Sequence, residues 1–471
     1  MNKERLKSIT LVCLIFLNFV LGGLIVTDKK LWPSGYNFFI SLENTLPVQL
    51  FRNLQAKFAG APEEIVHLSA PESIIINTGY QSSRFSVGAD EALFLEITEA
   101  CGEILATAFS EQDAPVPVSQ EEWFGALMSK SIYLEYPADC QTSLFARLLG
   151  VKNPPAAEYV QSFLRLVVSA DAPAVVYLED SNTTSYYRIS TSHTPEALLE
   201  LIADYQAGSE ASSTSSSILN YSFDLRFDQS VSGQNAIIAP MVPIYSNPQT
   251  ARSLQAENPM KTAAGSLDWG VIERILNVFD MNPDTVRHYT ETGGTIVFVQ
   301  NDAVLKLYTD GLLDYRAKGG GMRLTRDPGA HRVLSEIAAL ADAVTDAANA
   351  QANLYVSSPL YESSNHFTLD YSAGGLPVIL ETPAAKHAVE VQVEDGYLLS
   401  YRQLLRRYHI GAPQQTPAYI SALDDAIAEY SASMNEIVIE KIYLSYTDDA
   451  SDAVKNADWT VAVKSLVERR E

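Results

Sequence analysis

Residues 268–316 read DWGVIERILNVFDMNPDTVRHYTETGGTIVFVQNDAVLKLYTDGLLDYR, and this stretch decides the fold class. Its beginning places Val271, Ile275, Leu276 and Phe279 on one face at helical spacing, which predicts a helix over 268–279. Four short strand-forming segments follow, at 285–290, 295–300, 303–308 and 312–316. The turn residues between them are Gly293-Gly294, Asn301-Asp302 and Asp310-Gly311. The stretch therefore predicts a helix packed on an antiparallel sheet.

The same order of elements recurs further along the chain. An Ala-rich segment at 332–350 predicts a second helix, and strands are expected at 367–371, 376–381, 388–393 and 397–402. A helix over 417–430, with Thr416 as its cap, and strands at 437–446 and 459–466 complete this part. The repetition is one of architecture and not of residues. We expect an α+β fold with helices packed on antiparallel sheets.

The part before residue 208 predicts a mixture of helices and strands. Helices are expected at 90–109, after the cap Ser119, at 143–149 and at 195–205, and strands at 73–77, 131–136, 160–169, 174–179 and 186–190. The stretch 208–217, GSEASSTSSS, buries nothing and predicts a linker, with a surface loop inside one domain as the alternative. The expected domains are 28–207, 218–325 and 326–471, after an anchor in 1–27.

The N-terminus predicts a membrane anchor. Residues 9–26, ITLVCLIFLNFVLGGLIV, are 18 uncharged residues that span about 27 Å as a helix, enough to cross the hydrocarbon core. Three basic residues precede the run and two follow it, which favours a cytoplasmic N-terminus and an extracytoplasmic body. The alternative is a cleaved signal peptide, but the run is long and has no A-x-A cleavage site. We expect a single-pass protein of the cell membrane.

One face of this anchor is a candidate partner-binding site. Asn18 lies near its midpoint, where an unpaired amide is costly and a hydrogen bond to another helix is the usual remedy. The residues that share its face are Leu11, Leu14, Ile15, Asn18, Leu21, Gly22 and Ile25. The alternative is that the anchor has no partner helix and tolerates Asn18, because the other residues of the run offset the cost of placing one amide in the membrane. Gly22-Gly23 is not a GxxxG dimer motif.

Charge and cysteine content exclude several classes of protein. The formal net charge is -24, and residues 1–27 hold three basic residues and one acidic residue, which leaves -26 on the rest. The charge argues against nucleic acid as a partner because phosphate binding needs clustered cations, although it leaves room for a local basic site. Three cysteines exclude a disulfide-built scaffold, and whether Cys101 and Cys140 pair stays open.

The search for chemistry finds no catalytic, cofactor or metal motif that stands out, so no catalytic, cofactor-binding or metal-ligating residue is assigned. None of the seven histidines forms HExxH. The SxxK and GxSxG nucleophile motifs are absent. The run 448–452, DDASD, resembles part of a calcium loop but lacks its Gly and Glu, so a solvated turn is the expectation. An extracytoplasmic module that binds a cell-wall fragment or peptide stays as an alternative function, followed by a wall hydrolase.

Four stretches together resemble the YycH family, membrane-anchored regulators of the essential YycG (WalK) sensor histidine kinase. They are the basic start 3–7 (KERLK) before the anchor, 123–127 (WFGAL) with 132–137 (IYLEYP), 285–287 (TVR) with the Gly293-Gly294 turn and 305–315 (LKLYTDGLLDY), and 374–378 (GGLPV) with 389–393 (VEVQV) and Ser400-Tyr401. Each piece is short, and their order and spacing carry the resemblance. Residues 208–258 depart from it.

The resemblance implies a non-enzymatic regulator with one transmembrane helix and an extracytoplasmic α/β body. Proteins of this family act with a related protein, YycI, and contact the kinase largely through transmembrane helices. The complex adjusts kinase output and, through it, cell-wall metabolism. This implies a function for the Asn18 face as a docking surface. The resemblance carries over no active-site residue, and it leaves open the sign of regulation, an extracellular ligand and the oligomeric state.

Overall fold

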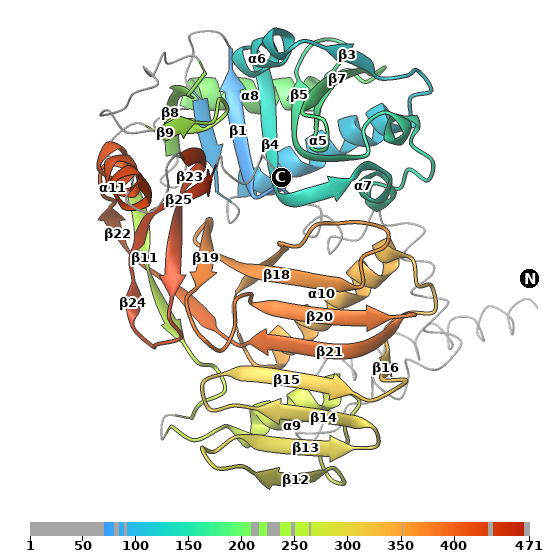
Figure 1. The fold of residues 1–471 in the computed structure, drawn as a ribbon, viewed down its shortest axis with the longest axis vertical. Coiled ribbons are helices and arrows are strands. Elements are labelled where there is room, and N and C mark those ends of the chain that lie inside the picture. The colour runs from blue at the N-terminus through green and yellow to red at the C-terminus, as the bar shows by residue number, and fades with distance from the viewer. Residues whose placement is uncertain are drawn as a thin grey trace, which may run out of the picture. The chain divides into compact units, whose positions relative to one another are not determined.

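The computed structural model describes residues 70–79, 84–88, 92–208, 216–223, 236–245, 250–262, 265–350, 352–431 and 437–465. They belong to one compact unit, Glu63–Glu471, whose elements are shown in Figure 1. Helices and largely antiparallel sheets alternate along it, so the expected α+β class is confirmed. The anchor expected at 9–26 lies outside the described residues. Within the part that is described, no helix combines the length and the apolar character that a membrane crossing needs.

The first half of the chain forms the N-terminal sheet, with the strand order β10-β8-β2-β1-β4-β5-β6-β7-β3. Its strands are β1 (Ser73–Thr78), β2 (Arg84–Val87), β3 (Val116–Val118), β4 (Lys130–Gln141), β5 (Ser162–Ser169), β6 (Val175–Asp180), β7 (Ser185–Ser190), β8 (Ser216–Tyr221) and β10 (Pro243–Tyr245). Its helices are α5 (Ala92–Ser110), α6 (Gln120–Met128), α7 (Thr142–Leu148), α8 (Glu196–Gly208) and the 3-10 turn η1 (Pro155–Glu158).

Side-chain alternation explains why this sheet is covered on both faces. In β1, Ile74 and Ile76 pack with residues of α5, α7 and α8, whereas Ile75 points to the other face and packs with Trp123 of α6. The helix α6 begins where the sequence predicted, because the Ser119 hydroxyl accepts a hydrogen bond from the backbone N–H of Glu122 at 3.3 Å.

The second half forms the large sheet, with the main order β12-β13-β14-β15-β21-β20-β18-β19-β23-β25. Its strands are β9 (Ala236–Ile238), β12 (Arg287–Thr290), β13 (Ile296–Gln300), β14 (Ala303–Leu307), β15 (Leu312–Ala317), β16 (Met322–Arg323), β17 (Asn353–Val356), β18 (His366–Ala373), β19 (Leu376–Leu380), β20 (Val389–Glu394), β21 (Tyr397–Leu404), β23 (Ile437–Asp448) and β25 (Ala457–Ser465). Its helices are α9 (Trp269–Val278), α10 (Ala330–Ala347) and α11 (Tyr419–Ser431).

The four strands predicted from residues 285–316 are confirmed as a meander of adjacent antiparallel strands. Positive φ angles occur at Gly293, Gly294, Asn301 and Gly311, which are the turn residues that the sequence indicated. The predicted helix is also present, and the Asp268 carboxylate caps it by accepting from the Gly270 N–H at 2.8 Å.

Long-range pairings differ from the simple expectation of two separate antiparallel units. Strand β15 pairs with β21, so the strands before and after residue 325 form one continuous sheet. Strand β23 pairs in parallel with both β19 and β9. A small sheet, β22-β11-β24, adds three strands that the sequence did not predict: β22 (Arg407–Gln415), β11 (Thr250–Glu257) and β24 (Val454–Lys455).

The Ser-rich stretch 208–217 connects two elements that pack in the same half of the chain. Helix α8 ends at Gly208 and β8 begins at Ser216, and β8 then pairs with β2 of the N-terminal sheet. The chain next enters the large sheet as β9 and returns to the N-terminal sheet as β10. The two sheets are therefore interleaved along the sequence.

Two apolar cores each contain residues from both halves of the chain. The second core joins Trp123, Tyr133 and Tyr245 of the N-terminal half to Tyr419 and Trp459 of the C-terminal half. The rings of Tyr245 and Trp459 lie 5.1 Å apart, and those of Tyr419 and Trp459 lie 5.2 Å apart. The junction of the two sheets is therefore a packed interior and not a hinge of exposed linkers.

Candidate functional site at the junction of the two sheets

The site that the sequence predicted lies outside the described residues. All seven members of the anchor face, Leu11, Leu14, Ile15, Asn18, Leu21, Gly22 and Ile25, fall before residue 70. Within the described body, several charged side chains meet beside a cavity where the N-terminal sheet meets β23 of the large sheet, and we take this junction as the candidate site.

A chain of alternating charges crosses the junction. The Lys441 ammonium of β23 forms an ion pair with Glu72, which precedes β1. The Arg165 guanidinium of β5 bonds the neighbouring Glu135 of β4, Nε to Oε1 at 3.2 Å, and then Glu179 of β6, Nη1 to Oε2 at 3.4 Å. Glu135 and Arg165 are direct cross-strand partners, so the sheet register itself brings them together.

The pKa values in this chain of charges follow from burial and mutual attraction. Burial by itself would lower the pKa of Lys441, but the carboxylates of Glu135 and Glu72 raise it above its ordinary value. Burial by itself would raise the pKa of Glu135, and the cations Lys441 and Arg165 lower it. The Lys441 ammonium also lies 5.3 Å from the centre of the Tyr443 ring. Lys441 and Glu135 therefore stay charged at neutral pH although Lys441 is only 21% exposed.

A cavity of about 70 Å³ adjoins this network. Strands of the N-terminal sheet line one side of it, through Glu135 and Tyr245, and strands of the large sheet line the other, through Lys441, Tyr443 and Pro377. Such a volume admits a few water molecules, whereas small-molecule sites measure about 300–1,000 Å³. The cavity at the junction is thus large enough for water and too small for a wall fragment.

A larger hollow lies beside α10 and β22 and measures about 660 Å³. Among the described residues that line it, Asp342 and Asp346 are acidic and Asn353, Ser372 and Thr345 are polar, and none is basic. An anionic polymer or phosphate would meet two carboxylates there without a compensating cation. This hollow therefore offers no support for recognition of an anionic wall component.

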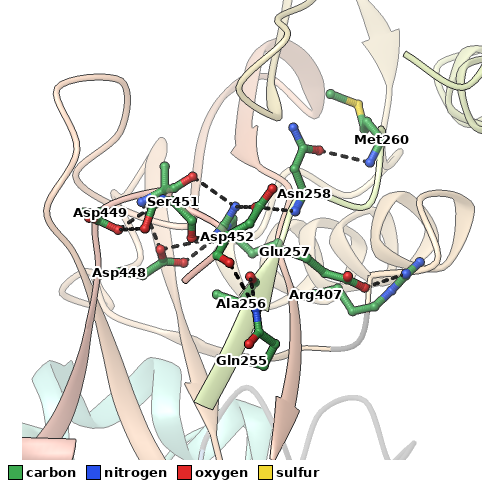
Figure 2. A network of polar contacts seen from close by, with 12 residues as sticks. Gln255, Ala256, Glu257, Asn258, Met260, Arg407, Asp448, Asp449, Ser451 and Asp452 are labelled. Carbon is green, nitrogen blue, oxygen red and sulfur yellow. Dashed lines mark hydrogen bonds and ion pairs between the residues drawn. The ribbon is translucent and has the colours of Figure 1, made fainter. Parts of the chain in front are cut away.

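A second buried charge network holds the small sheet to the large one (Figure 2). Arg406, which directly precedes β22, is fully buried and bonds Asp448 of β23 in a bidentate manner, Nε to Oδ2 at 2.8 Å and Nη2 to Oδ1 at 3.2 Å. The Tyr408 hydroxyl also donates to Asp448, at 2.9 Å. Asp452 accepts from the Asn258 N–H at 3.1 Å, which attaches the end of β11 to the same turn.

The expectation of a solvated turn at 448–452 is wrong for Asp448, which has no exposed surface. The guanidinium of Arg406 neutralises Asp448, and it also donates to the Ser451 carbonyl at 2.7 Å. Arg406 lies in a stretch, LLRRYH, whose two arginines give no sequence signal of which one is buried. Within the described residues, no three His, Cys, Asp or Glu side chains converge as a metal site would require.

The two cysteines of the body are free and buried in the N-terminal half. Burial raises the pKa of Cys101 to about 12, and the pKa of Cys140 is also raised. Both are therefore protonated and unreactive at neutral pH. The question that the sequence left open is answered: Cys101 and Cys140 do not form a disulfide.

Sequence reasoning did not single out Lys441, Glu135 or Arg165. Glu135 and Arg165 each interrupt an apolar strand, in IYLEYP and SFLRLVV, and Lys441 follows Glu440 in IVIEKIYLSY, so a charge within an otherwise apolar strand is the only signal that precedes the structure. Alternation within a strand does not show that these three charges meet, because Lys441 lies more than 250 residues after Glu135 and Arg165 in the sequence.

The architecture is an α+β body in which the strands of the N-terminal sheet and the large sheet are interleaved along the sequence, with a small third sheet. A solved structure with this fold is that of YycH from Bacillus subtilis: the TM-score is 0.55 at 11% sequence identity, over 85% of this chain and 95% of that chain. At this identity the likeness is one of fold. No family model matches the chain. No curated protein matches it either.

Proposed function

We propose that this chain is a membrane-anchored regulator of a sensor histidine kinase of the YycG (WalK) type. The observation that carries the proposal is the likeness of fold to YycH, which extends over 95% of that chain. The uncharged run 9–26 and the family-like stretches of the sequence support it. The chain would lie in the cell membrane with a cytoplasmic N-terminus and an extracytoplasmic body. It would act with a YycI-like partner, without enzymatic activity, and influence cell-wall homeostasis.

The physical logic of such a regulator is a differential affinity. A protein that binds one conformation of the kinase more tightly than the other shifts the kinase population toward that conformation. If the regulator binds one conformation more tightly by about 1.4 kcal/mol, the ratio of the two kinase conformations changes about tenfold. The packed junction of the two sheets favours a body that transmits a contact as one unit, because cores shared by both halves resist relative movement.

The first experiment is co-purification of the full-length chain with its membrane histidine kinase after mild crosslinking. A parallel version carries an unrelated apolar anchor in place of residues 9–26 and keeps Lys3, Arg5 and Lys7, so that insertion and orientation are preserved. Capture of the kinase by the native chain, and its loss on anchor exchange, is the expected result. Capture by both versions would move the contact to the body. Capture by neither would overturn the proposal.

The next variant tests the anchor face itself. Asn18→Leu removes the only amide of the run while making the helix more apolar, so it should still insert. Because a hydrogen bond between membrane helices contributes about 1 kcal/mol, we expect kinase capture to fall about fivefold. Phe16→Leu, off the proposed face, is the matched control and should capture the kinase as the native chain does. Equal capture by both variants would contradict a role for Asn18.

A further inference from the structure

Strand β12 is a free edge of the large sheet. It stands at the end of the strand order and pairs only with β13 among the described strands, as Figure 1 shows. All four of its residues, Arg287–Thr290, are exposed. Tyr289 is 54% exposed, and Trp269 of α9, whose ring lies 5.4 Å from His288, is 48% exposed. Two large aromatic side chains thus remain in solvent beside a strand edge that pairs with no other described strand.

The hydrogen bonding of the hairpin shows which backbone groups point outward. The Glu291 N–H donates to the Thr295 carbonyl at 2.8 Å, across the turn toward β13. Since alternate residues of an antiparallel strand bond to opposite sides, Arg287 and Tyr289 also bond toward β13. The N–H and C=O groups of His288 and Thr290 therefore point away from the sheet, where an added strand would meet them.

We propose that this edge pairs with the same edge of a second copy of the chain, antiparallel, with Tyr289 opposite Tyr289 of the second copy. In a symmetric antiparallel pair, the outward N–H and C=O groups of one copy must face those of the other copy. The registers that meet this condition place His288, Thr290 or Tyr289 on the two-fold axis. The two alternatives set Arg287 or Glu291 opposite Tyr289. Only the register centred on Tyr289 sets Arg287 opposite Glu291 of the second copy, and it does so twice by symmetry.

This register satisfies both the backbone and the charges. His288 of each copy and Thr290 of the other exchange two backbone hydrogen bonds. Tyr289 and Arg287 occupy the closely spaced, non-hydrogen-bonded positions of the antiparallel pair, where cross-strand side chains interact most strongly. Glu291 already accepts from the Lys306 ammonium at 3.0 and 3.2 Å, and a carboxylate has lone pairs for a second cation. An acidic chain thus presents a self-complementary pair of charges at its free edge.

The inference is independent of the proposed kinase contact and is tested by disulfide trapping in the full-length chain. Tyr289→Cys is made in a Cys13→Ser background, which removes the thiol of the apolar run. Residues at a closely spaced antiparallel pair have Cα atoms about 4.5 Å apart, which is within disulfide range. Mild oxidation of membranes, and of the purified chain in detergent, should yield a disulfide-linked dimer.

Arg316→Cys is the matched control. Arg316 lies on β15, on the same sheet face as Tyr289 but away from the edge, and its side chain is 70% exposed. Its cysteine should give no dimer above background. Equal dimer yields at the two positions, or trapping of a different protein in place of a second copy at Tyr289→Cys, would overturn the proposal.

Two further changes in the Tyr289→Cys chain test the register. Thr290→Pro removes an outward N–H and should abolish trapping, whereas Thr290→Val keeps this N–H and should still be trapped. The proline variant should fold, because proline is tolerated where the N–H of an edge strand faces solvent. Arg287→Glu should reduce the trapped fraction about fivefold, since two exposed ion pairs become like-charge contacts. A thermal melt confirms folding, and if Thr290→Pro fails to fold, Arg287→Glu alone decides the register. Trapping that is indifferent to Arg287→Glu would overturn the register.

Discussion

Arg406 and Asp448 form the most fully buried ion pair of the described body, with no exposed surface on either side chain. Removal of one partner from such a pair leaves an uncompensated charge in the interior, whereas replacement of both by apolar groups is often tolerated. The pair is satisfied by several further bonds from Tyr408 and the 448–452 turn. The Arg406–Asp448 pair therefore attaches β22 and β11 to β23.

At the scale of this residue we predict that Arg406→Ala lowers the free energy of unfolding by about 3–5 kcal/mol. Its neighbour is the matched control: Arg407 is partly exposed and pairs with Glu257 at 2.9 Å, so Arg407→Ala should cost about 1 kcal/mol or less. Denaturant unfolding of the full chain measures both. The double change Arg406→Met with Asp448→Leu should recover most of the loss. Equal losses for the two arginines would contradict the prediction.

Glu135 predicts an acid dependence of stability. Its pKa is lower in the folded chain than its ordinary value, because Lys441 and Arg165 outweigh the effect of burial. Its contribution is therefore present above about pH 4.3, the value of a free Glu, and is lost as the pH falls through the folded pKa. We expect a shallower loss of stability as the pH falls below about 4.3 in Glu135→Gln than in the native chain. Unfolding by urea across this range checks it, and parallel curves would contradict it.

At the scale of elements, α11 is held in place by aromatic packing. The helix contributes Tyr419, Leu423 and Ile427 to the core that contains Trp459 of β25. The Trp459 indole N–H also donates to the Pro417 carbonyl at 2.9 Å, just before the helix begins. A single side chain thus joins α11 to the last strand of the large sheet.

We predict that Trp459→Ala lowers the free energy of unfolding by about 3–5 kcal/mol, as expected for a large buried side chain. Trp459 is 9% exposed, whereas Trp269 is 48% exposed and serves as a matched control. Trp269→Ala should cost about 1 kcal/mol or less, since much of its surface stays in water. Thermal or denaturant melts distinguish the two. Similar costs would mean that α11 does not depend on this contact.

Elements differ in how far they could be predicted. The meander 285–316 was predictable because each strand pairs with its neighbour and the turns carry Gly, Asn and Asp. Strands β11 and β22 were missed. They pair across 150 to 165 residues, and β22 holds Gly411 and Pro413, so the local pattern gave no strand signal. The candidate site at the junction was missed for the same reason, since Lys441 meets Glu72 only through the tertiary fold.

At the scale of the whole described body, the two sheets share their cores. Strand β9 belongs to the large sheet although β8 and β10, on either side of it in sequence, belong to the N-terminal sheet. Leu360 also forms a parallel bridge beside Cys140 of β4: its N–H donates to the Asp139 carbonyl and its carbonyl accepts from the Gln141 N–H, both at 2.8 Å. Neither half completes its interior alone.

We therefore predict a single cooperative unfolding transition for the two sheets. Trp123→Ala in the N-terminal half and Trp459→Ala in the C-terminal half should both lower the midpoint of the same transition. Calorimetry together with near- and far-ultraviolet circular dichroism measures it. Two transitions, each shifted by only one of the variants, would show that the halves unfold independently.

The sequence by itself determined the α+β class, the hairpin meander, the positions of most helices and the presence of an 18-residue uncharged run. These features depend on local periodicity, capping and turn residues, which act over a few residues. Only the tertiary structure decided the continuous large sheet, the parallel partners of β23, the burial of Arg406 and Asp448, and the pairing of Lys441 with Glu72. Those features arise from contacts between distant segments, whose register is set by which apolar faces bury together and not by any local pattern.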